Sequence, residues 1–319
     1  MIQAPIPVPI PLKSAKKLTR TSIHKDFKRN WSLYLLVLPV LIFYILFHYF
    51  PMYGAIIAFK DFSPMRGIAG SPWVGFRHFE SFFQSHFFGR VMRNTFWINI
   101  NTLLFGFPAP IIFALLLNEI RNSFFKKITQ TITYLPHFIS LVVVAGLIRI
   151  FTANTGIIND IIALFGGTRV TMLNRAELFV PIYVISEIWQ TFGWSSIIYL
   201  AALSSIDPTL YEAAEIDGAG RWKQTLHITL PGIMPTIVIL LILRMGNLFT
   251  VGFEKIILLY NPVIYETADV ISTFVYRRGL LEFNWSFSTA VGLFNSALNF
   301  SMLLMANWIS KKVNKTSLW

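Results

Sequence analysis

Six long apolar stretches constrain this chain more than any other feature of its sequence. A helix that crosses a lipid bilayer needs about 20 consecutive residues that are mostly apolar. Six segments meet this requirement, with ends set to within a few residues. The sequence therefore predicts an all-α membrane protein with six transmembrane helices, over residues 31–50, 96–117, 132–151, 179–202, 232–251 and 287–309.

The composition agrees with an embedded protein. Of the 319 residues, 55% are hydrophobic and 13% are charged, whereas a soluble domain carries about 25% charged residues. We therefore expect one transmembrane domain over residues 31–319, behind a basic tail of residues 1–30. The net charge of +12 fits cytoplasmic loops and anionic lipid headgroups better than a nucleic-acid partner. Because the chain has no cysteine, it offers neither a thiolate nucleophile nor a cysteine-ligated metal site.

The basic tail sets the expected orientation, because lysine and arginine are costly to translocate. The N-terminus is thus predicted to be cytoplasmic, and six crossings return the C-terminus to the same side. Stretches predicted to face outward also hold basic residues, but these are spread over longer loops. The inner stretches hold Arg121, Lys126, Lys127, Arg221, Lys223, Lys311, Lys312 and Lys315.

The polar segment between the fourth and fifth apolar stretches has the signals of two short helices. Asp207 can cap a helix, and Pro208 fits its first turn, where a missing N–H costs nothing. Gly218 is expected to end that helix, because only glycine adopts a left-handed conformation readily. A second short helix over 221–227 follows, and Pro231 opens the next apolar segment. These signals predict a helix–turn–helix elbow at the membrane surface.

The elbow carries a spaced motif that resembles the EAA loop of permease subunits in ATP-binding-cassette (ABC) importers. The family pattern is E-A-A, three residues, G, nine residues and I-x-L-P. A single E-A-A would mean little, whereas the full spacing inside a membrane protein is specific. The alternative is an ordinary cytoplasmic connector. The chain matches the pattern without departure, as Glu212-Ala213-Ala214, Gly218, Ile228 and Leu230-Pro231.

Other segments resemble one branch of this family, the carbohydrate importer permeases typified by LplB. These segments are residues 50–54, 58–61, 71–76, 94–95 and 199–203. Within that branch the chain is similar to the permease pair of bacterial alginate importers. The resemblance covers the chain from its first apolar stretch to its C-terminus.

The resemblance implies a type I ABC importer permease fold in the cytoplasmic (inner) membrane of a bacterium. It also implies a heterodimer with a second permease subunit, two ATP-binding ATPase subunits on the cytoplasmic side and an extracytoplasmic substrate-binding protein. Residues 203–231 would then form the coupling loop. The residues expected to couple to the ATPase are Glu212, Ala213, Ala214, Asp217, Gly218, Ile228, Leu230 and Pro231.

The sequence contains no catalytic or cofactor motif. It lacks the Gly-rich phosphate loop with Gly-Lys-Ser/Thr. We therefore expect ATP and Mg on the partner ATPase subunits, and no cofactor or metal on this chain. The H-E-x-x-H and G-x-S-x-G patterns are also missing, which argues against a membrane enzyme. The chain is expected to be a non-catalytic subunit that forms half of a translocation path.

Ionisable side chains at membrane depth are expensive and are candidates for function. Glu187 lies about 12 Å from the outer end of the fourth stretch, and Arg244 about 20 Å from the inner end of the fifth, which is a similar depth. The two could form a structural ion pair, or one or both could face the path. The other path candidates are Gln190, Trp194, Asn247, Asn295 and Asn299.

This set of side chains suits a sugar. Planar amides and carboxylates bind sugar hydroxyls, and aromatic faces cover the apolar side of the ring. Polar residues also hold membrane helices together, at about 0.6 kcal/mol on average. An anionic sugar such as a uronate would give the intramembrane arginines a purpose. The predicted function is ATP-driven import of oligosaccharides. The alternatives are a stand-alone secondary transporter or channel, which needs ion-coupling residues, and a scaffold that recruits proteins to the membrane.

Overall fold

The computed structural model describes residues 27–314, with the side chains of residues 27–312. This part of the chain is helical, as predicted, and its only extended pairing is an isolated bridge between Lys60 and Trp73. The chain divides into two units, Met1–Ala55 and Ile56–Trp319. Most of the predicted basic tail lies outside the described residues.

The described part of the first unit is a helix that matches the first predicted span. It consists of α2 (Trp31–Tyr44), the π-helical turn η1 (Ile45–Tyr49) and α3 (Phe50–Met52). With η2 (Tyr53–Phe59), these elements form one helical run over Trp31–Phe59. No side chain of α2, η1 or α3 is buried. Apolar residues cover every face of this helix, which is typical of a helix surrounded by lipid.

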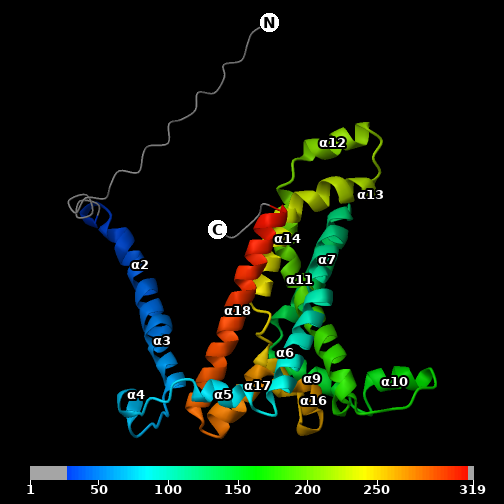
Figure 1. Cartoon of the computed structure of the whole chain (residues 1–319). Coiled ribbons are helices and arrows are strands. Elements are labelled where there is room, and N and C mark those ends of the chain that lie inside the picture. The colour runs from blue at the N-terminus through cyan, green and yellow to red at the C-terminus, as the bar shows by residue number, and fades with distance from the viewer. Residues whose placement is uncertain (1–26, 315–319) are drawn as a thin grey trace. The chain divides into compact units, whose positions relative to one another are not determined.

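Long helices form the frame of the second unit (Figure 1). The elements of the frame are α6 (Phe88–Asn101), η3 (Thr102–Gly106), α7 (Pro108–Glu119), α8 (Ser123–Tyr134), η4 (Leu135–Phe138), α9 (Leu141–Phe151), α11 (Ala176–Ser204), α13 (Arg221–Gln224), η6 (Thr225–Thr229), α14 (Leu230–Met245) and α18 (Trp285–Asn314). Helix α11 packs along α7 and against α14, and α14 packs against α18. Helix α11 therefore lies at the centre of the frame.

The third predicted span, residues 132–151, is not one straight helix. The α8–η4 segment is bent by 98° from α9. Pro136 lies in η4 and lacks the N–H that would continue the helix. Ser140 then caps α9, because its hydroxyl accepts a hydrogen bond from the N–H of Val143. The apolar stretch thus contains a break at Pro136 and Ser140.

The fifth predicted span, residues 232–251, does not match the helix at either end. The helix begins earlier, because α13 and η6 lead directly into α14 and form one run over Arg221–Met245. Pro231 therefore lies within a helix and does not open one. The π-helical turn η6 precedes Pro231 and accommodates its missing N–H. The predicted second elbow helix is the first part of this run.

The number of membrane crossings is only partly settled by helix length and hydropathy. Four described helical runs are long and apolar enough to cross a membrane, and the bent pair α8–α9 would be a fifth. Helix α11 has 29 residues and is about 43 Å long, but it is not among these runs. Six crossings remains a prediction.

Short helices gather at one end of the second unit, away from the elbow. In Figure 1, α12, α13 and the C-terminal end of α18 lie at one end of this unit, and α5, α10, α16 and α17 lie at the other. The short helix of the elbow is α12 (Pro208–Ile216). The other short elements are α4 (Gly67–Gly70), α5 (Arg77–Phe83), α10 (Ile157–Leu164), η5 (Met172–Asn174), α15 (Phe253–Leu259), η7 (Pro262–Ile264), α16 (Tyr265–Ala268), α17 (Ile271–Tyr276) and η8 (Arg277–Leu281).

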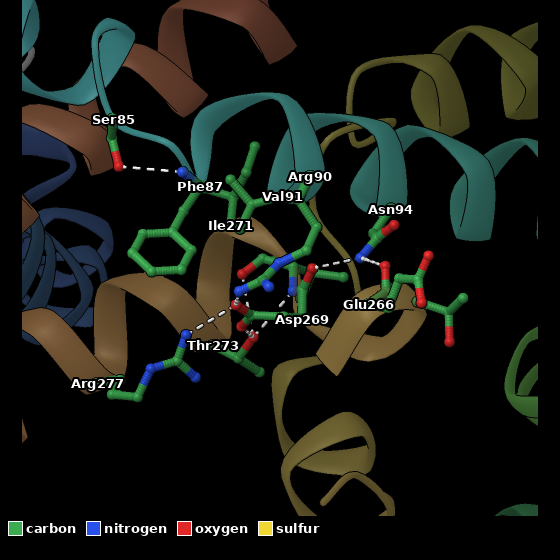
Figure 2. A network of polar contacts seen from close by, with 12 residues as sticks. Ser85, Phe87, Arg90, Val91, Asn94, Glu266, Asp269, Ile271, Thr273 and Arg277 are labelled. Carbon is green, nitrogen blue, oxygen red and sulfur yellow. Dashed lines mark hydrogen bonds and ion pairs between the residues drawn. The ribbon is translucent and has the colours of Figure 1, made fainter. Parts of the chain in front are cut away.

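A buried carboxylate, that of Asp269, connects several elements at the end of the unit opposite the elbow. The side chain of Asp269 is fully enclosed, and Figure 2 shows Arg90, Thr273 and Arg277 converging on it. Its Oδ2 accepts from Arg90 at 3.2 Å and from Arg277 at 2.7 Å, and its Oδ1 accepts from Thr273 at 2.9 Å. Nδ2 of Asn94 donates to the Asp269 carbonyl at 3.0 Å. The network fixes the start of α6 against α17 and η8.

Replacing Asp269 with asparagine is expected to destabilise the protein, because two arginines lose their shared anion. Breaking a buried ion pair from one side costs about 3 kcal/mol. We expect a clear fall in the melting temperature of the detergent-purified complex.

The matched control is Asp160→Asn, which breaks the exposed pair of Asp160 with Arg169, where the side chains are 54% and 44% exposed. Exposed pairs contribute about 1 kcal/mol at most, so this variant should melt close to the wild type. Equal melting temperatures for the two variants would contradict the role given to Asp269.

Candidate functional site: the elbow and two central cavities

The elbow between α11 and α14 begins with a capped helix. Asp207 is the N-cap of α12, and its Oδ1 accepts a hydrogen bond from the N–H of Thr209 at 3.0 Å. This hydrogen bond lowers the pKa of Asp207 and favours the carboxylate, which also suits the positive end of the helix. The predicted cap and the predicted place of Pro208 are both confirmed.

Gly218 ends the first elbow helix, as predicted, in a left-handed conformation with φ of 73°. The N–H of Ala219 donates to the carbonyl of Ala214 at 2.8 Å, and the N–H of Gly218 donates to the carbonyl of Glu215 at 3.0 Å. These two bonds form the Schellman pattern that closes a helix C-terminus. A Cβ at position 218 would meet no atom within 4 Å. The backbone conformation alone therefore restricts this position.

Two side-chain contacts fix the elbow to the helices next to it. The hydroxyl of Tyr211 lies 3.0 Å from Oγ1 of Thr229, which joins α12 to the start of the α13–α14 run. Nη1 of Arg221 lies 3.7 Å from Oε2 of Glu119 at the end of α7. The elbow is thus held on the helices that line the rest of the site.

The outer surface of the elbow carries large apolar side chains. Leu210, Ile216 and Trp222 are 51%, 87% and 74% exposed, and Glu212 is exposed beside them. Large apolar side chains exposed in one short segment are candidates for contact with another subunit. The remaining coupling candidates are exposed or half-buried in the same segment, namely Ala213, Ala214, Asp217, Ile228, Leu230 and Pro231.

Two adjoining cavities lie against the middle of α11. The first has a volume of about 580 Å³ and is lined by η3, α7, α11 and α14. The second has a volume of about 730 Å³ and is lined by α6, η4, α11 and α15. Trp194 lines the first cavity, and Gln190 lines the second. The residues that line both are Thr102, Glu187, Thr191 and Arg244.

Glu187 pairs with Lys255 and not with Arg244. Oε2 of Glu187 lies 2.9 Å from Nζ of Lys255. The turn after Met245 leads into α15 and brings Lys255 back onto α11, where its Nζ lies 4.9 Å from the ring centroid of Tyr183. The Glu187–Arg244 pair considered from the sequence is therefore absent. Arg244 forms no ion pair with any residue in the described part of the chain.

Aromatic rings flank these polar groups. The rings of His137 and Trp194 stack with centroids 4.8 Å apart and an angle of 3° between their planes. Phe138 meets Trp194 edge to face at 5.2 Å. His137 lines the second cavity, because the bend at η4 turns it toward α11. Flat rings at a cavity wall that also carries polar groups suit the apolar face of a sugar.

The three asparagines predicted for the path do not line these two cavities. Asn299 holds the turn after α14, since its Oδ1 accepts from the N–H of Phe249 at 2.8 Å and its Nδ2 donates to Oγ1 of Thr250 at 2.9 Å. Asn247 donates to a carbonyl of α14 at 3.2 Å. Asn295 lines a separate cavity of about 480 Å³ between α17, η8 and α18.

Comparison with known proteins identifies the family. Residues 106–315 match the family described as binding-protein-dependent transport system inner membrane component. This match covers more than half of the chain. The chain belongs to this family. It is a permease subunit of an ABC transporter, and the resemblance inferred from the EAA motif is confirmed.

Two proteins of Bacillus subtilis (strain 168) are similar to this permease over most of their length. The polygalacturonan/rhamnogalacturonan transport system permease protein YteP is 45% identical over 288 residues, which is 90% of each chain. Protein LplB is 44% identical over 293 residues, which is 92% of each chain.

Two solved structures have the same fold as this permease. One is a bacterial ABC transporter involved in the import of the acidic polysaccharide alginate, with a TM-score of 0.85 and 47% identity over 92% of this chain and 99% of that chain. The other is a bacterial alginate ABC transporter in complex with an alginate pentasaccharide-bound periplasmic protein, with the same values.

Lys255 and His137 are two of the cavity residues that the sequence did not reveal. Lys255 lies in a stretch assigned to an outer loop, and its signal is a lone lysine at the start of an apolar run, Ile256 to Leu259. His137 directly follows Pro136, the residue that marks the break in the third span. Both signals become informative only when the helix ends are known.

Replacing Gly218 with valine is expected to disorder the turn of the elbow. A β-branched residue at positive φ is strained by about 1–2 kcal/mol, so α12 would no longer be held at its present angle. Uptake by the reconstituted transporter should fall, while ATP hydrolysis by the ATPase subunits continues, so that hydrolysis is no longer coupled to transport. Gly218→Asn is the control, because asparagine tolerates this conformation and should preserve uptake. Unchanged uptake with valine would contradict the role of the turn.

Proposed function

We propose that this permease forms half of the path of an ATP-driven importer of acidic oligosaccharides. The observation that carries the proposal is Arg244, which lines both cavities and has no ion pair among the described residues. An arginine at membrane depth is costly without an anionic partner. A uronate carboxylate of the substrate would supply that partner.

The relatives support the same class of substrate. One solved structure belongs to an importer of the acidic polysaccharide alginate, and YteP is named for polygalacturonan and rhamnogalacturonan. These polymers contain uronic acid units. A stand-alone secondary transporter is not favoured, because the family is binding-protein-dependent.

The remaining cavity side chains suit a sugar bound beside Arg244. The amide of Gln190 and the hydroxyl of Thr191 can bind sugar hydroxyls, and the ring of Trp194 can cover an apolar face. Amides bind the hydroxyl groups at the edge of a sugar ring, whereas an aromatic ring covers its apolar face. A second permease subunit would complete the cavity and supply the facing groups.

The elbow is proposed to dock on an ATPase subunit in the cytoplasm. Its exposed apolar residues and Glu212 offer a contact surface, and Glu212 can pair with a basic residue of the partner. The C-terminal end of α18 lies at the same end of the second unit as the elbow (Figure 1). With the elbow in the cytoplasm, the C-terminus is cytoplasmic too, and α5, α10, α16 and α17 face a substrate-binding protein outside.

Closure of the ATPase subunits on ATP would then move the cavity. ATP and Mg would be bound by those subunits. The displacement would enter through α12 and pass along α11 and α14, the two helices that carry Glu187 and Arg244. Rocking of these helices would switch the cavity from inward-facing to outward-facing, where it accepts the sugar from the binding protein.

Uptake by the complete transporter in vesicles tests this proposal. We expect uronic oligosaccharides to be taken up in preference to neutral ones of the same length. Arg244→Gln should lower uronic uptake by about tenfold or more, because the substrate carboxylate loses a charged hydrogen-bond partner. Arg244→Lys keeps the charge and should retain most of the uptake.

The same preparations provide the control for assembly. Each variant should co-purify with its ATPase subunits and keep its basal ATP hydrolysis. Uptake of neutral oligosaccharides alone, or full uronic uptake by Arg244→Gln, would contradict the proposal.

A further inference from the structure

The Lys255–Glu187 ion pair has a consequence for the cavity beyond its own stability. Glu187 has a half-buried side chain, 28% exposed, on the wall shared by the two cavities. Arg244 lines the same two cavities. The space shared by the two cavities therefore holds one carboxylate and one cation, with Lys255 beside Glu187 in the second cavity, and the way these three groups pair decides which charge is left for a ligand.

Lys255 is held tightly in its place. Its side chain is 2% exposed, and its Nζ lies 2.9 Å from Glu187 and 3.5 Å from the carbonyl of Tyr183. The ring of Tyr183 lies 4.9 Å from the same nitrogen. An enclosed ammonium needs a carboxylate nearby, and Glu187 is the only acidic side chain that pairs with it among the described residues.

The other ionisable groups at these cavities do not change this pairing. Glu254 lines the second cavity from the first turn of α15, but it forms no ion pair with any cation in the described part of the chain. The ring of His137 is stacked on Trp194. With Lys255 bound to Glu187, the charge of Arg244 remains without an internal partner.

We infer that Lys255 is a positioning residue for substrate specificity, which occupies Glu187 and thereby keeps Arg244 free for a carboxylate of the substrate. This inference rests on the proposed function. Without Lys255, the carboxylate of Glu187 faces the same space as Arg244 and becomes its internal partner. The substrate carboxylate then has to compete with a group that is always present in the cavity.

A cycle of variants in the complete transporter tests this inference. Lys255→Met should lower uronic uptake by about tenfold, since Glu187 then competes for Arg244. Adding Glu187→Gln removes the competing carboxylate and should restore uptake to within about threefold of the wild type. In the Arg244→Gln background, Lys255→Met should cause no further loss, because the group through which it acts is already absent.

A purely structural ion pair gives a different result. Nζ of Lys255 and the guanidinium of Arg244 are both hydrogen-bond donors and do not bind each other, so independent effects would multiply when the two substitutions are combined. Multiplied losses, or unchanged uptake in Lys255→Met, would overturn the inference.

Two further outcomes separate this inference from the proposed function. If Lys255→Met does not assemble, Lys255→Gln, which removes the charge but keeps a polar group beside Glu187, takes its place and must show the same loss of uptake and the same rescue by Glu187→Gln. If the wild-type complex does not carry uronic oligosaccharides, the proposed function fails and this inference fails with it. If the wild-type complex does carry uronic oligosaccharides but the losses from Lys255→Met and Arg244→Gln multiply, this inference fails and the proposed function stands.

Discussion

The hydrocarbon interior of a membrane offers no hydrogen-bond partner to the backbone. Each crossing segment of this permease therefore has to satisfy its own N–H and C=O groups by forming a helix. Helices that satisfy all their own hydrogen bonds are stiff, and this stiffness makes a mechanical permease possible. Helix α11 is the central case, with 29 residues and a single internal proline, Pro181. It carries Glu187 on the cavity wall and ends beside Asp207, where the elbow begins. One helix therefore connects the elbow to the cavity wall.

The same lack of water makes charged side chains in the cavity costly, so each of them needs a partner of opposite charge. Glu187 has one in Lys255, which the turn after α14 brings back onto α11. Arg244 has no ion-pair partner within the described residues, which is the reason for proposing an acidic substrate. The relatives that carry acidic polysaccharides in their names agree with this chemistry. The unpaired Arg244 is a feature of this chain's own structure, and it does not depend on the names of the relatives.

Features set by local chemistry could be predicted from the sequence. The cap at Asp207 and the left-handed Gly218 depend on neighbours close in the chain, and the structure confirms them. Helix length and hydropathy support at most five of the six predicted spans in the described part of the chain. Predictions that depend on long-range folding were less complete. The bend at Pro136 was hidden in a continuous apolar stretch.

The site was predictable only in part, for a similar reason. Glu187, Gln190, Trp194 and Arg244 come together as polar residues of adjacent helices, which their depth indicated. The pairing of Glu187 depends on where α14 ends, and composition does not give that position. The helix face of Asn299 suggests a residue of the path. In the structure its Oδ1 accepts a hydrogen bond from the backbone of a turn, and sequence spacing does not reveal that turn.

Cross-linking of the elbow is the most direct test of the account, because the chain contains no cysteine and one introduced thiol is unique. Ile216→Cys places that thiol at an 87% exposed position of the elbow, and Leu164→Cys places it at an 83% exposed position of α10 at the opposite end of the unit. In the assembled transporter, with cysteine-bearing ATPase subunits, a short bifunctional maleimide should join position 216 to an ATPase subunit and stop uptake. Position 164 should not be joined to an ATPase subunit. Cross-linking at position 164 but not at 216 would contradict the coupling role of the elbow.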